Sequence, residues 1–182
     1  MGNRAHITID VQNDFCPEGR LAVTAGDEVV PVINQRVKNP AYKRKYNSRD
    51  WHPPGSEHFK KWPTHCVEKT LGAAFHPDLD LTDAVIITKG QDPALDGYSA
   101  FEGTTSWGAM LEDDLRAHGI TDIDIEGLAT EYCVKKSAID GAKRGFNVTV
   151  YLDGCRAVNI KPGDEEAAIV EMRAAGVNVV AA

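Results

Sequence analysis

The sequence has few of the features that mark secreted, membrane-bound or disulfide-stapled proteins. Only four of its 182 residues are cysteines, and no two of them form a Cys-x-x-Cys pair. Residues 1–7 lack the apolar core of a signal peptide, and no apolar run is long enough to cross a membrane. We therefore expect a cytoplasmic protein whose four thiols are reduced.

The sequence also lacks an excess of basic residues. Twenty lysines and arginines face 27 aspartates and glutamates, which gives a formal net charge of −7. A general nucleic-acid binder would need a basic face, so we expect neither nucleic-acid nor membrane partners. Hydrophobic residues make up 42% of the chain and charged residues 26%, as in ordinary folded proteins. We interpret residues 1–182 as a single domain with a core of its own.

Strand-like and helix-like segments alternate along the chain. Short β-branched segments predict strands, and apolar residues three or four apart predict helices. The predicted strands are 5–11, 42–49, 84–89, 122–126, 147–153 and 177–180, and the predicted helices are 27–38, 107–118, 131–144 and 163–174. Strand 84–89 has the apolar character of a buried strand, whereas 42–49 (YKRKYNSR) is too polar for one. This order predicts an α/β fold of three αβα layers, with a mostly parallel, doubly wound sheet of about six strands.

Several polar residues follow directly on predicted strands. Asp10, Lys89 and Asp153 lie at or next to strand ends, and the loop 128–133 follows another strand. Ligands of open parallel sheets bind at the carboxyl edge, where these residues would meet. Each residue alone also has an ordinary explanation, because a carboxylate can cap a turn and a lysine can extend to solvent. Their convergence on one edge favours a functional site.

Cys133 stands near the beginning of the predicted helix 131–144, directly after a strand. Unpaired backbone N–H groups and the helix dipole favour a thiolate at such a position, so this cysteine is a candidate nucleophile. A nucleophile also needs a base and groups that hold the electrophile. Considered by itself, a cysteine is more commonly a small buried hydrophobic residue.

The loop 49–66 (RDWHPPGSEHFKKWPTHC) is rich in residues that bind metals. It holds three of the six histidines, and a carboxylate lies two residues before the first of them. The Asp-x-His spacing in an extended segment directs both side chains to one side. Imidazoles with a carboxylate suit zinc, iron or manganese, so the set favours a metal site over a solvated loop. The four candidate ligands are Asp50, His52, His58 and His65.

Motifs along almost the whole chain resemble those of the isochorismatase-like cysteine hydrolases, and within them the nicotinamidases, also called pyrazinamidases. The motifs are Asp10-Val-Gln-Asn-Asp-Phe-Cys, Arg49-Asp-Trp-His-Pro, His58, Trp62-Pro-Thr-His-Cys, Lys89-Gly, Gly97-Tyr-Ser-Ala-Phe and Gly127-Leu-Ala-Thr-Glu-Tyr-Cys-Val. The resemblance implies a metal-dependent amidohydrolase. It would convert nicotinamide to nicotinate and ammonia through a cysteine acyl-thioester, would also accept pyrazinamide, and would serve NAD salvage.

The resemblance also implies which residues carry the chemistry. The catalytic triad would be Asp10, Lys89 and Cys133. The oxyanion hole would consist of the backbone N–H groups of Ala129 and Cys133, after a cis peptide bond at Leu128–Ala129.

Substrate and metal binding are implied in the same way. An aromatic pocket of Phe15, Trp62 and Tyr98 would hold a flat pyridine ring. One divalent ion, zinc in the first place and otherwise iron or manganese, would be bound by the four candidate ligands of the loop 49–66.

Other activities on the same scaffold stay as alternatives. A sister cysteine amidase would act on another carboxamide, carbamoyl or ureido substrate, although the metal ligands argue against the metal-free amidases. An isochorismatase cleaves a vinyl ether and does not need Cys133. A non-catalytic relic of the fold would have no reason to keep all three triad residues. A homo-oligomer stays open, since no apolar patch in the sequence decides it.

Three residues fit these expectations less well. Tyr132 precedes the cysteine where some members of the family carry histidine, and Glu131 stands where aspartate is frequent. Glu126 falls within a strand that we expect to be buried. We interpret Glu126 as facing a subunit interface or as lying beyond the end of a shorter strand.

Overall fold

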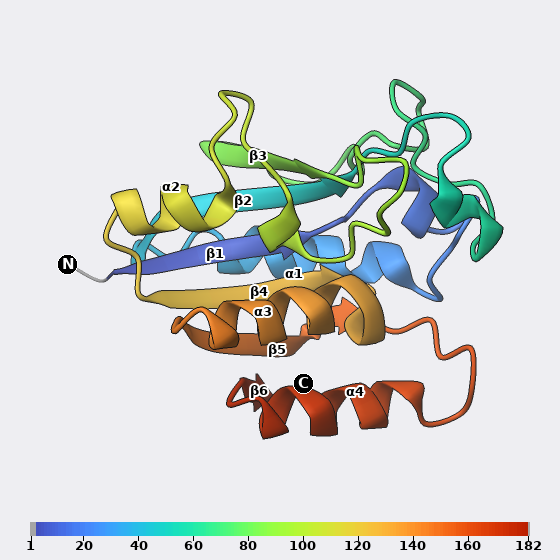
Figure 1. The fold of residues 1–182 in the computed structure, drawn as a ribbon. Coiled ribbons are helices and arrows are strands. Elements are labelled where there is room, and N and C mark those ends of the chain that lie inside the picture. Colours follow the sequence, from blue (N-terminus) through green and yellow to red (C-terminus); the bar gives the residue numbers. More distant parts are fainter. Residues whose placement is uncertain (1–2, 182) are drawn as a thin grey trace.

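The computed structural model describes residues 3–181, which form one six-stranded sheet flanked by helices (Figure 1). The strands lie in the order β3-β2-β1-β4-β5-β6, and all five neighbouring pairs are parallel. The predicted αβα class is therefore confirmed. The strands are β1 (Arg4–Ile9), β2 (Tyr42–Asp50), β3 (Ala84–Lys89), β4 (Asp122–Leu128), β5 (Asn147–Arg156) and β6 (Asn178–Val180).

Four α-helices and several short turns connect these strands. The helices are α1 (Val29–Arg36), α2 (Leu111–Ala117), α3 (Lys135–Lys143) and α4 (Asp164–Ala174). The 3₁₀ turns are η1 (Asn13–Phe15), η2 (Gly26–Glu28), η3 (Glu57–Lys60) and η4 (Ala100–Glu102), and η5 (Thr130–Val134) is a π-helical turn. No helix within residues 3–181 has the length and apolar character needed to span a membrane.

The two faces of the sheet differ because side chains alternate along each strand. On β4, Ile123 and Ile125 point towards α2, α3 and α4 and are fully buried there, together with Leu115, Ala138 and Met172. On the opposite face, which faces α1, Asp124 and Glu126 take part in ion pairs. A second apolar core joins Val29 and Ile33 of α1 to Val11, Phe15 and Leu128. This second core supports the loops at the carboxyl edge of the sheet.

The polar second strand forms as predicted, and the structure explains its composition. β2 is an interior strand between β3 and β1, and several of its polar side chains are partnered. Arg44 Nη2 donates to Asp114 of α2 at 2.8 Å, and the Tyr46 hydroxyl donates to the same carboxylate at 2.6 Å. Ser48 donates to Asp10 at 2.7 Å. Buried polar groups are tolerated where hydrogen bonds satisfy them, so this strand is compatible with an interior place.

Two predicted elements differ in character or length. Strand 84–89 forms at these bounds, but it is one of the two edge strands of the sheet, and Val85 and Ile86 are only half-buried. The helix predicted over 107–118 begins only at Leu111. The residues before it form a turn instead, in which Thr105 N–H donates to Ala109 O at 2.8 Å and Trp107 is exposed.

The two interpretations of Glu126 are both wrong. β4 is longer than predicted and ends at Leu128, so Glu126 lies inside it, fully buried. Its carboxylate is 2.7 Å from His6 Nε2 and accepts a hydrogen bond from Arg36 Nε at 2.9 Å. A buried carboxylate is tolerated where partners of this kind surround it. Glu126 therefore ties β4 to β1 and α1 within one chain.

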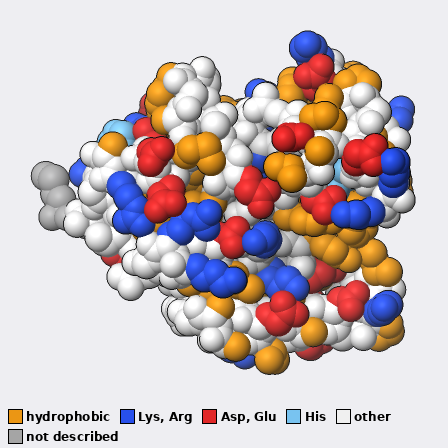
Figure 2. Space-filling view, viewed as in Figure 1, with side chains coloured by type: hydrophobic (Ala, Val, Ile, Leu, Met, Phe, Trp, Pro, Cys, Tyr) orange, Lys and Arg blue, Asp and Glu red, His pale blue; other side chains and the backbone are white. Residues whose placement is uncertain are grey.

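The surface carries charges of both signs. On the face shown in Figure 2, acidic and basic side chains are interspersed, and apolar side chains gather towards the right-hand end. At this end of the molecule the strands of Figure 1 finish. The carboxyl edge is the place where the topology predicts a binding site.

Candidate active site

Four neighbouring strands deliver one polar side chain each to the carboxyl edge of the sheet. Asp10 follows β1, Asp50 ends β2, Lys89 ends β3, and Cys133 lies in η5 directly after β4. Asp50 and Lys89 are register partners. All four residues are buried, so their charges and protons act on one another with little screening by water.

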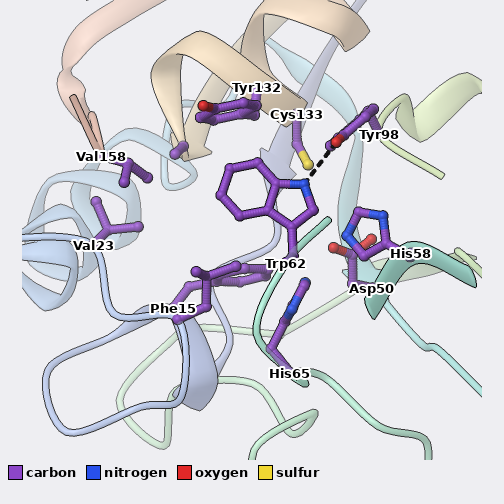
Figure 3. A pocket seen from close by; sticks show the side chains of 12 residues that line it. Phe15, Val23, Asp50, His58, Trp62, His65, Tyr98, Tyr132, Cys133 and Val158 are labelled. Carbon is purple, nitrogen blue, oxygen red and sulfur yellow. Dashed lines mark hydrogen bonds between the residues drawn. The ribbon is translucent and has the colours of Figure 1, made fainter. Parts of the chain in front are cut away.

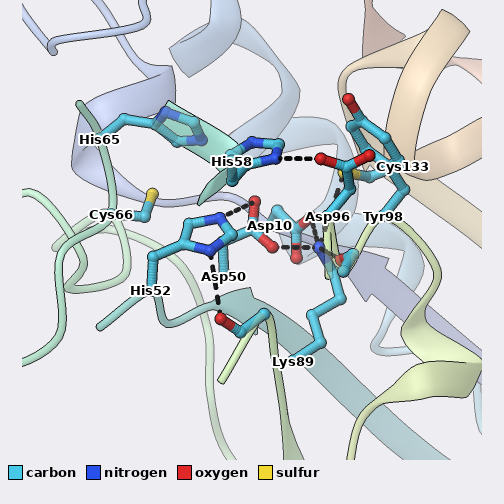
Figure 4. Close-up of polar contacts among 12 residues, drawn as sticks. Asp10, Asp50, His52, His58, His65, Cys66, Lys89, Asp96, Tyr98 and Cys133 are labelled. Carbon is cyan, nitrogen blue, oxygen red and sulfur yellow. Dashed lines mark hydrogen bonds and ion pairs between the residues drawn. The ribbon is translucent and has the colours of Figure 1, made fainter. Parts of the chain in front are cut away.

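Lys89 is the centre of this cluster (Figure 4). Its Nζ lies 2.7 Å from Asp10 Oδ2 and 3.6 Å from Cys133 Sγ, and it donates to Gly97 O at 2.9 Å. It also donates to Asp50 Oδ1. An ammonium group without exposure to water is tolerable only when opposite charges and acceptors surround it, and here they do. A lysine at a strand end ordinarily extends to solvent. Lys89 does not, because its side chain is buried.

The pKa values of the cluster follow from burial and from these charges. Burial alone would lower the pKa of Lys89, but the carboxylates of Asp10 and Asp50 outweigh it and raise that pKa well above its ordinary value. Burial raises the pKa of Asp10, and the Lys89 ammonium opposes this rise only in part. Burial would also raise the pKa of Asp50, but there Lys89 and His52 prevail and lower it. One carboxylate is thus suited to accept a proton, while the other stays ionised.

The thiol of Cys133 belongs to the same electrostatic system. Burial raises its pKa well above the ordinary value for cysteine, and Lys89 acts in the opposite direction. The sulfur lies within 4.8 Å of a carboxylate oxygen of Asp10 and one of Asp50. Burial disfavours the charged forms of both the thiol and Asp10, and the Lys89 ammonium favours both, so the thiol proton has an acceptor and the thiolate has a counter-charge beside it.

Three histidines form a second cluster beside the first one. One ring nitrogen of each lies within 4.8 Å of the others, and all three rings are buried. The Nδ1 atoms of the rings are held by oxygen acceptors: His52 by Gly90 O at 3.1 Å, His58 by Asp96 Oδ1 at 2.9 Å and His65 by Pro63 O at 2.7 Å. Because an oxygen acceptor pairs with a protonated Nδ1–H, the unprotonated nitrogen of each neutral ring is Nε2.

These residues fit a divalent metal ion. His52 Nε2 is buried without a hydrogen-bond partner and lies 3.7 Å from Asp50 Oδ2. Burial lowers the pKa of His58 and of His65, which keeps both rings in the neutral form that metals bind. The structure thus brings together all four ligands predicted from the loop 49–66, with Asp50 between the histidines and Lys89.

A single pocket opens onto both clusters (Figure 3). The three predicted aromatic residues line it, and Trp62 Nε1 donates to the Tyr98 hydroxyl at 2.8 Å. Tyr132 adds a fourth aromatic ring, whose centroid is 4.9 Å from that of Trp62 at an interplanar angle of 89°. The pocket is lined by Phe15, Leu21, Val23, Asp50, His58, Trp62, His65, Tyr98, Ala129, Tyr132, Cys133 and Val158.

The turn before Cys133 has the backbone geometry that the resemblance implies. The Leu128–Ala129 peptide is cis. Ala129 O accepts from Tyr132 N at 3.1 Å and from Val134 N at 3.3 Å, and the latter bond spans five residues. This wide turn is why a π-helical segment precedes α3, where the sequence predicts one continuous helix over 131–144. The N–H groups of Ala129 and Cys133 both belong to it.

Asp153 does not join the site. It was expected at the same sheet edge, but β5 continues to Arg156 and the Asp153 carboxylate pairs with Arg36 Nη2 at 2.6 Å. It belongs to the ion-pair network of Glu126, on the side of the sheet that faces α1. The longer strand is the reason for the difference.

Gln12 is a residue of the site that the sequence did not single out. Its side-chain amide donates to Asp50 O at 2.8 Å and accepts from Asp50 N at 2.8 Å, so that it continues the pairing of β1 with β2 by a side chain. It also donates to Ala73 O at 2.9 Å. Gln12 is fully buried three residues after the end of β1, and its one sign in the sequence was its place in the motif that begins at Asp10.

Fold and site together define an α/β domain whose sheet edge holds a buried thiol, a buried lysine and a group of side chains that could bind a metal ion. A family model described as "Isochorismatase domain" matches residues 4–182, and the chain belongs to this family.

Relatives with an assigned enzymatic activity are similar to this chain over nearly its full length. The nicotinamidase of Escherichia coli is 38% identical over 97% of this chain and 93% of its own. The nicotinamidase/pyrazinamidase of Mycobacterium tuberculosis is 36% identical over 97% of this chain and 98% of its own. Among solved structures, the pyrazinamidase of Pyrococcus horikoshii in complex with zinc is similar with a TM-score of 0.87, 40% identity and 99% coverage of each chain.

Proposed function

We propose that this protein is a nicotinamidase, an amidohydrolase that converts nicotinamide to nicotinate and ammonia and also accepts pyrazinamide. One observation carries the proposal: a single aromatic pocket is lined by Cys133 and by the histidines His58 and His65. A flat ring stacked in this pocket can present its amide to the thiol while its nitrogen faces the histidines. The relatives that are nicotinamidases support the same activity.

Catalysis begins with a proton transfer. Asp10 accepts the proton of the Cys133 thiol, and Lys89, at 2.7 Å from the carboxylate and 3.6 Å from the sulfur, stabilises the thiolate that forms. The thiolate attacks the carboxamide carbon, and the backbone N–H groups of Ala129 and Cys133 bind the oxyanion of the tetrahedral intermediate.

The intermediate then collapses to a thioester. Asp10 returns its proton to the leaving nitrogen, the C–N bond breaks and ammonia departs. A water molecule, deprotonated by Asp10, attacks the thioester carbon. The C–S bond breaks, nicotinate leaves, and Cys133 recovers its proton. Lys89 remains protonated throughout, because Asp50 stays ionised beside it while Asp10 exchanges its proton.

The aromatic residues select the substrate. Phe15, Trp62 and Tyr98 surround the ring, and the hydrogen bond from Trp62 to Tyr98 fixes the two side chains relative to each other. A planar heterocycle fits such walls better than a flexible ureido acid, which favours nicotinamide over the substrates of a sister amidase.

The metal ligands would be Asp50, His52, His58 and His65, with zinc as the first candidate and iron or manganese as the others. When bound, the ion supplies a Lewis acid towards the ring nitrogen of the substrate and so orients the ring. Gly90 O and Pro63 O hold two of the imidazoles in the orientation that ligation needs.

We also propose a cytoplasmic role in NAD salvage, since nicotinate is a pyridine precursor. Four free, buried cysteines are in keeping with a reducing compartment. The partner is a small carboxamide, and the net charge of −7 speaks against nucleic acid. No argument from the fold requires a homo-oligomer.

The direct test is ammonia release by the purified protein. Nicotinamide should give equal amounts of nicotinate and ammonia, a chelator should abolish the reaction, and added zinc should restore it. An N-carbamoyl amino acid offered in parallel should be hydrolysed far more slowly. A zinc-loaded protein that released ammonia only from the carbamoyl substrate would overturn the proposal in favour of the sister amidase.

A further inference from the structure

Asp96 is a charged residue of the loop 90–98 that contacts the histidine cluster (Figure 4). Its Oδ1 lies 2.9 Å from His58 Nδ1, and its Oδ2 accepts from Lys61 Nζ at 2.8 Å. The side chain is 29% exposed, so it closes the cluster on the solvent side. The proposed reaction gives it no role.

The group that pairs with Nδ1 of His58 differs from those that pair with Nδ1 of the other two histidines. Backbone carbonyls hold His52 and His65, and the course of the chain fixes these acceptors. Among residues 3–181, Asp96 is the one carboxylate paired with an Nδ1 atom of the three rings. A carboxylate in this position fixes the ring with Nε2 towards a metal and makes that nitrogen a stronger donor.

The two residues after Asp96 contact the remaining parts of the site. Gly97 O accepts a hydrogen bond from Lys89 Nζ at 2.9 Å. The Tyr98 hydroxyl accepts one from Trp62 Nε1 at 2.8 Å. Three consecutive residues thus reach a metal ligand, the buried lysine and the wall of the pocket.

The loop 90–98 is also joined to the metal-ligand loop farther along. Glu57, the first residue of the turn η3 that carries His58, donates its N–H to Pro93 O at 2.9 Å. The position of His58 therefore depends on the loop 90–98 through both a backbone and a side-chain contact.

We propose that Asp96 is a positioning residue that sets the metal affinity of the site through His58. Through Gly97 and Tyr98, the same segment links the metal site to the catalytic lysine and the substrate pocket. The inference rests on the proposed function, because it requires that the histidine cluster binds a metal. It assigns Asp96 no direct contact with substrate.

Zinc affinity of the purified protein tests the proposal, measured by competition with a chromophoric chelator. Asp96→Ala removes both the hydrogen bond and the charge, and zinc binding should weaken by about 10- to 100-fold. Asp96→Asn keeps an acceptor for His58 Nδ1–H without the charge, so its affinity should lie between wild type and Asp96→Ala.

Asp92→Asn is the matched control, because Asp92 lies in the same loop and its Oδ1 accepts only from Ala94 N–H. This variant should bind zinc like wild type. The unfolding temperature of the zinc-free protein should be the same for wild type and Asp96→Asn, which separates a role towards the metal from a merely structural one. At saturating zinc, the KM of Asp96→Ala for nicotinamide should rise more than kcat falls.

The outcomes separate the inference from the function on which it rests. Unchanged zinc affinity in both Asp96 variants, with wild type binding zinc, would overturn the inference alone. Wild-type protein that took up no zinc, iron or manganese would overturn the proposed metal site itself. An Asp92→Asn variant as weak as Asp96→Asn would mean that general loop charge, not the contact with His58, sets the affinity.

Discussion

Cys133 and Lys89 illustrate how little a single residue reveals before its neighbours are known. A cysteine at a helix start is usually a packing residue, and a lysine at a strand end usually reaches solvent. The structure places the two side chains 3.6 Å apart, both buried, with the Asp10 carboxylate 2.7 Å from the lysine. The reactivity expected at this edge of the sheet depends on the proximity of Cys133, Lys89 and Asp10, since none of the three side chains would be reactive by itself.

Replacement of Cys133 by alanine should abolish turnover. The variant keeps the histidine cluster but has no atom that can form a thioester, so kcat should fall by at least about 10⁴-fold. Ammonia release from nicotinamide measures the loss, and zinc content measured in parallel should equal that of wild type. Residual activity within ten-fold of wild type would contradict a thioester mechanism.

Replacement of Gln12 by alanine should destabilise the protein. The variant would lose three hydrogen bonds to the buried backbone, two to Asp50 at 2.8 Å each and one to Ala73 O at 2.9 Å. The backbone of Asp50 would then no longer be held by a side chain of the neighbouring strand's loop. Unsatisfied buried groups of this kind should lower the free energy of unfolding by about 2–4 kcal/mol. Urea unfolding of the zinc-free protein measures this change in the free energy of unfolding.

Gln91→Ala is the control for this measurement, because Gln91 is exposed. It should change the unfolding free energy by less than about 0.5 kcal/mol. If the two variants were equally stable, the hydrogen bonds of the Gln12 amide to Asp50 would not contribute to stability.

At the scale of elements, the contact between β2 and α2 through Asp114 is sensitive to pH. Burial would raise the pKa of Asp114, but hydrogen bonds from Tyr46 and Arg44 outweigh it and lower that pKa. A carboxyl group with a lowered pKa in the folded state stabilises the protein above its unfolded pKa of about 3.9. This stabilisation is lost as the pH falls through the folded value.

Asp114→Asn should therefore be less stable than wild type at pH 7, with a difference that narrows below about pH 4. Urea midpoints of both proteins between pH 7 and pH 3 test this expectation. A difference that stayed constant down to pH 3 would show that charge on Asp114 contributes nothing.

The limits of sequence reasoning also appear at this scale. Periodicity located the apolar strands and the four α-helices, because apolar alternation and helical spacing are local properties of the chain, whereas the polar strand 42–49 was expected only from its position in the chain. It did not reveal that β3 is an edge strand, since strand order depends on pairing across the sheet. It also misplaced Glu126, whose partners His6 and Arg36 are 120 and 90 residues away. The candidate site was predicted from motifs, strand ends and the histidine-rich loop, whereas the hydrogen bonds of Gln12 to Asp50 and the contact of Asp96 with His58 became visible only in the structure.

At the scale of the whole molecule, binding of a metal ion should stabilise the folded protein. A ligand that binds only the folded state at 100 times its Kd stabilises it by about 2.7 kcal/mol. For a chain of this length, such a gain raises the Tm by roughly 5–10 °C. Thermal unfolding with excess zinc and with a chelator measures the shift.

His52→Ala is the decisive comparison, because it removes the buried Nε2 atom that has no other partner. The shift of Tm on zinc addition should largely disappear in this variant. An equal shift in wild type and His52→Ala would locate the stabilising zinc elsewhere on the protein.

The strand order has a consequence for how the protein acquires its activity. β1 lies between β2 and β4, and the residue pairs that join them are about 40 and 120 positions apart in the chain. Parallel pairing over such separations is slow, because long loops must close before the contacts form. Asp10, Asp50, Lys89 and Cys133 come from four of these strands or their loops, so no partly assembled chain holds all of them. During refolding, recovery of hydrolysis should therefore coincide with completion of the central sheet and lag behind the appearance of helical signal.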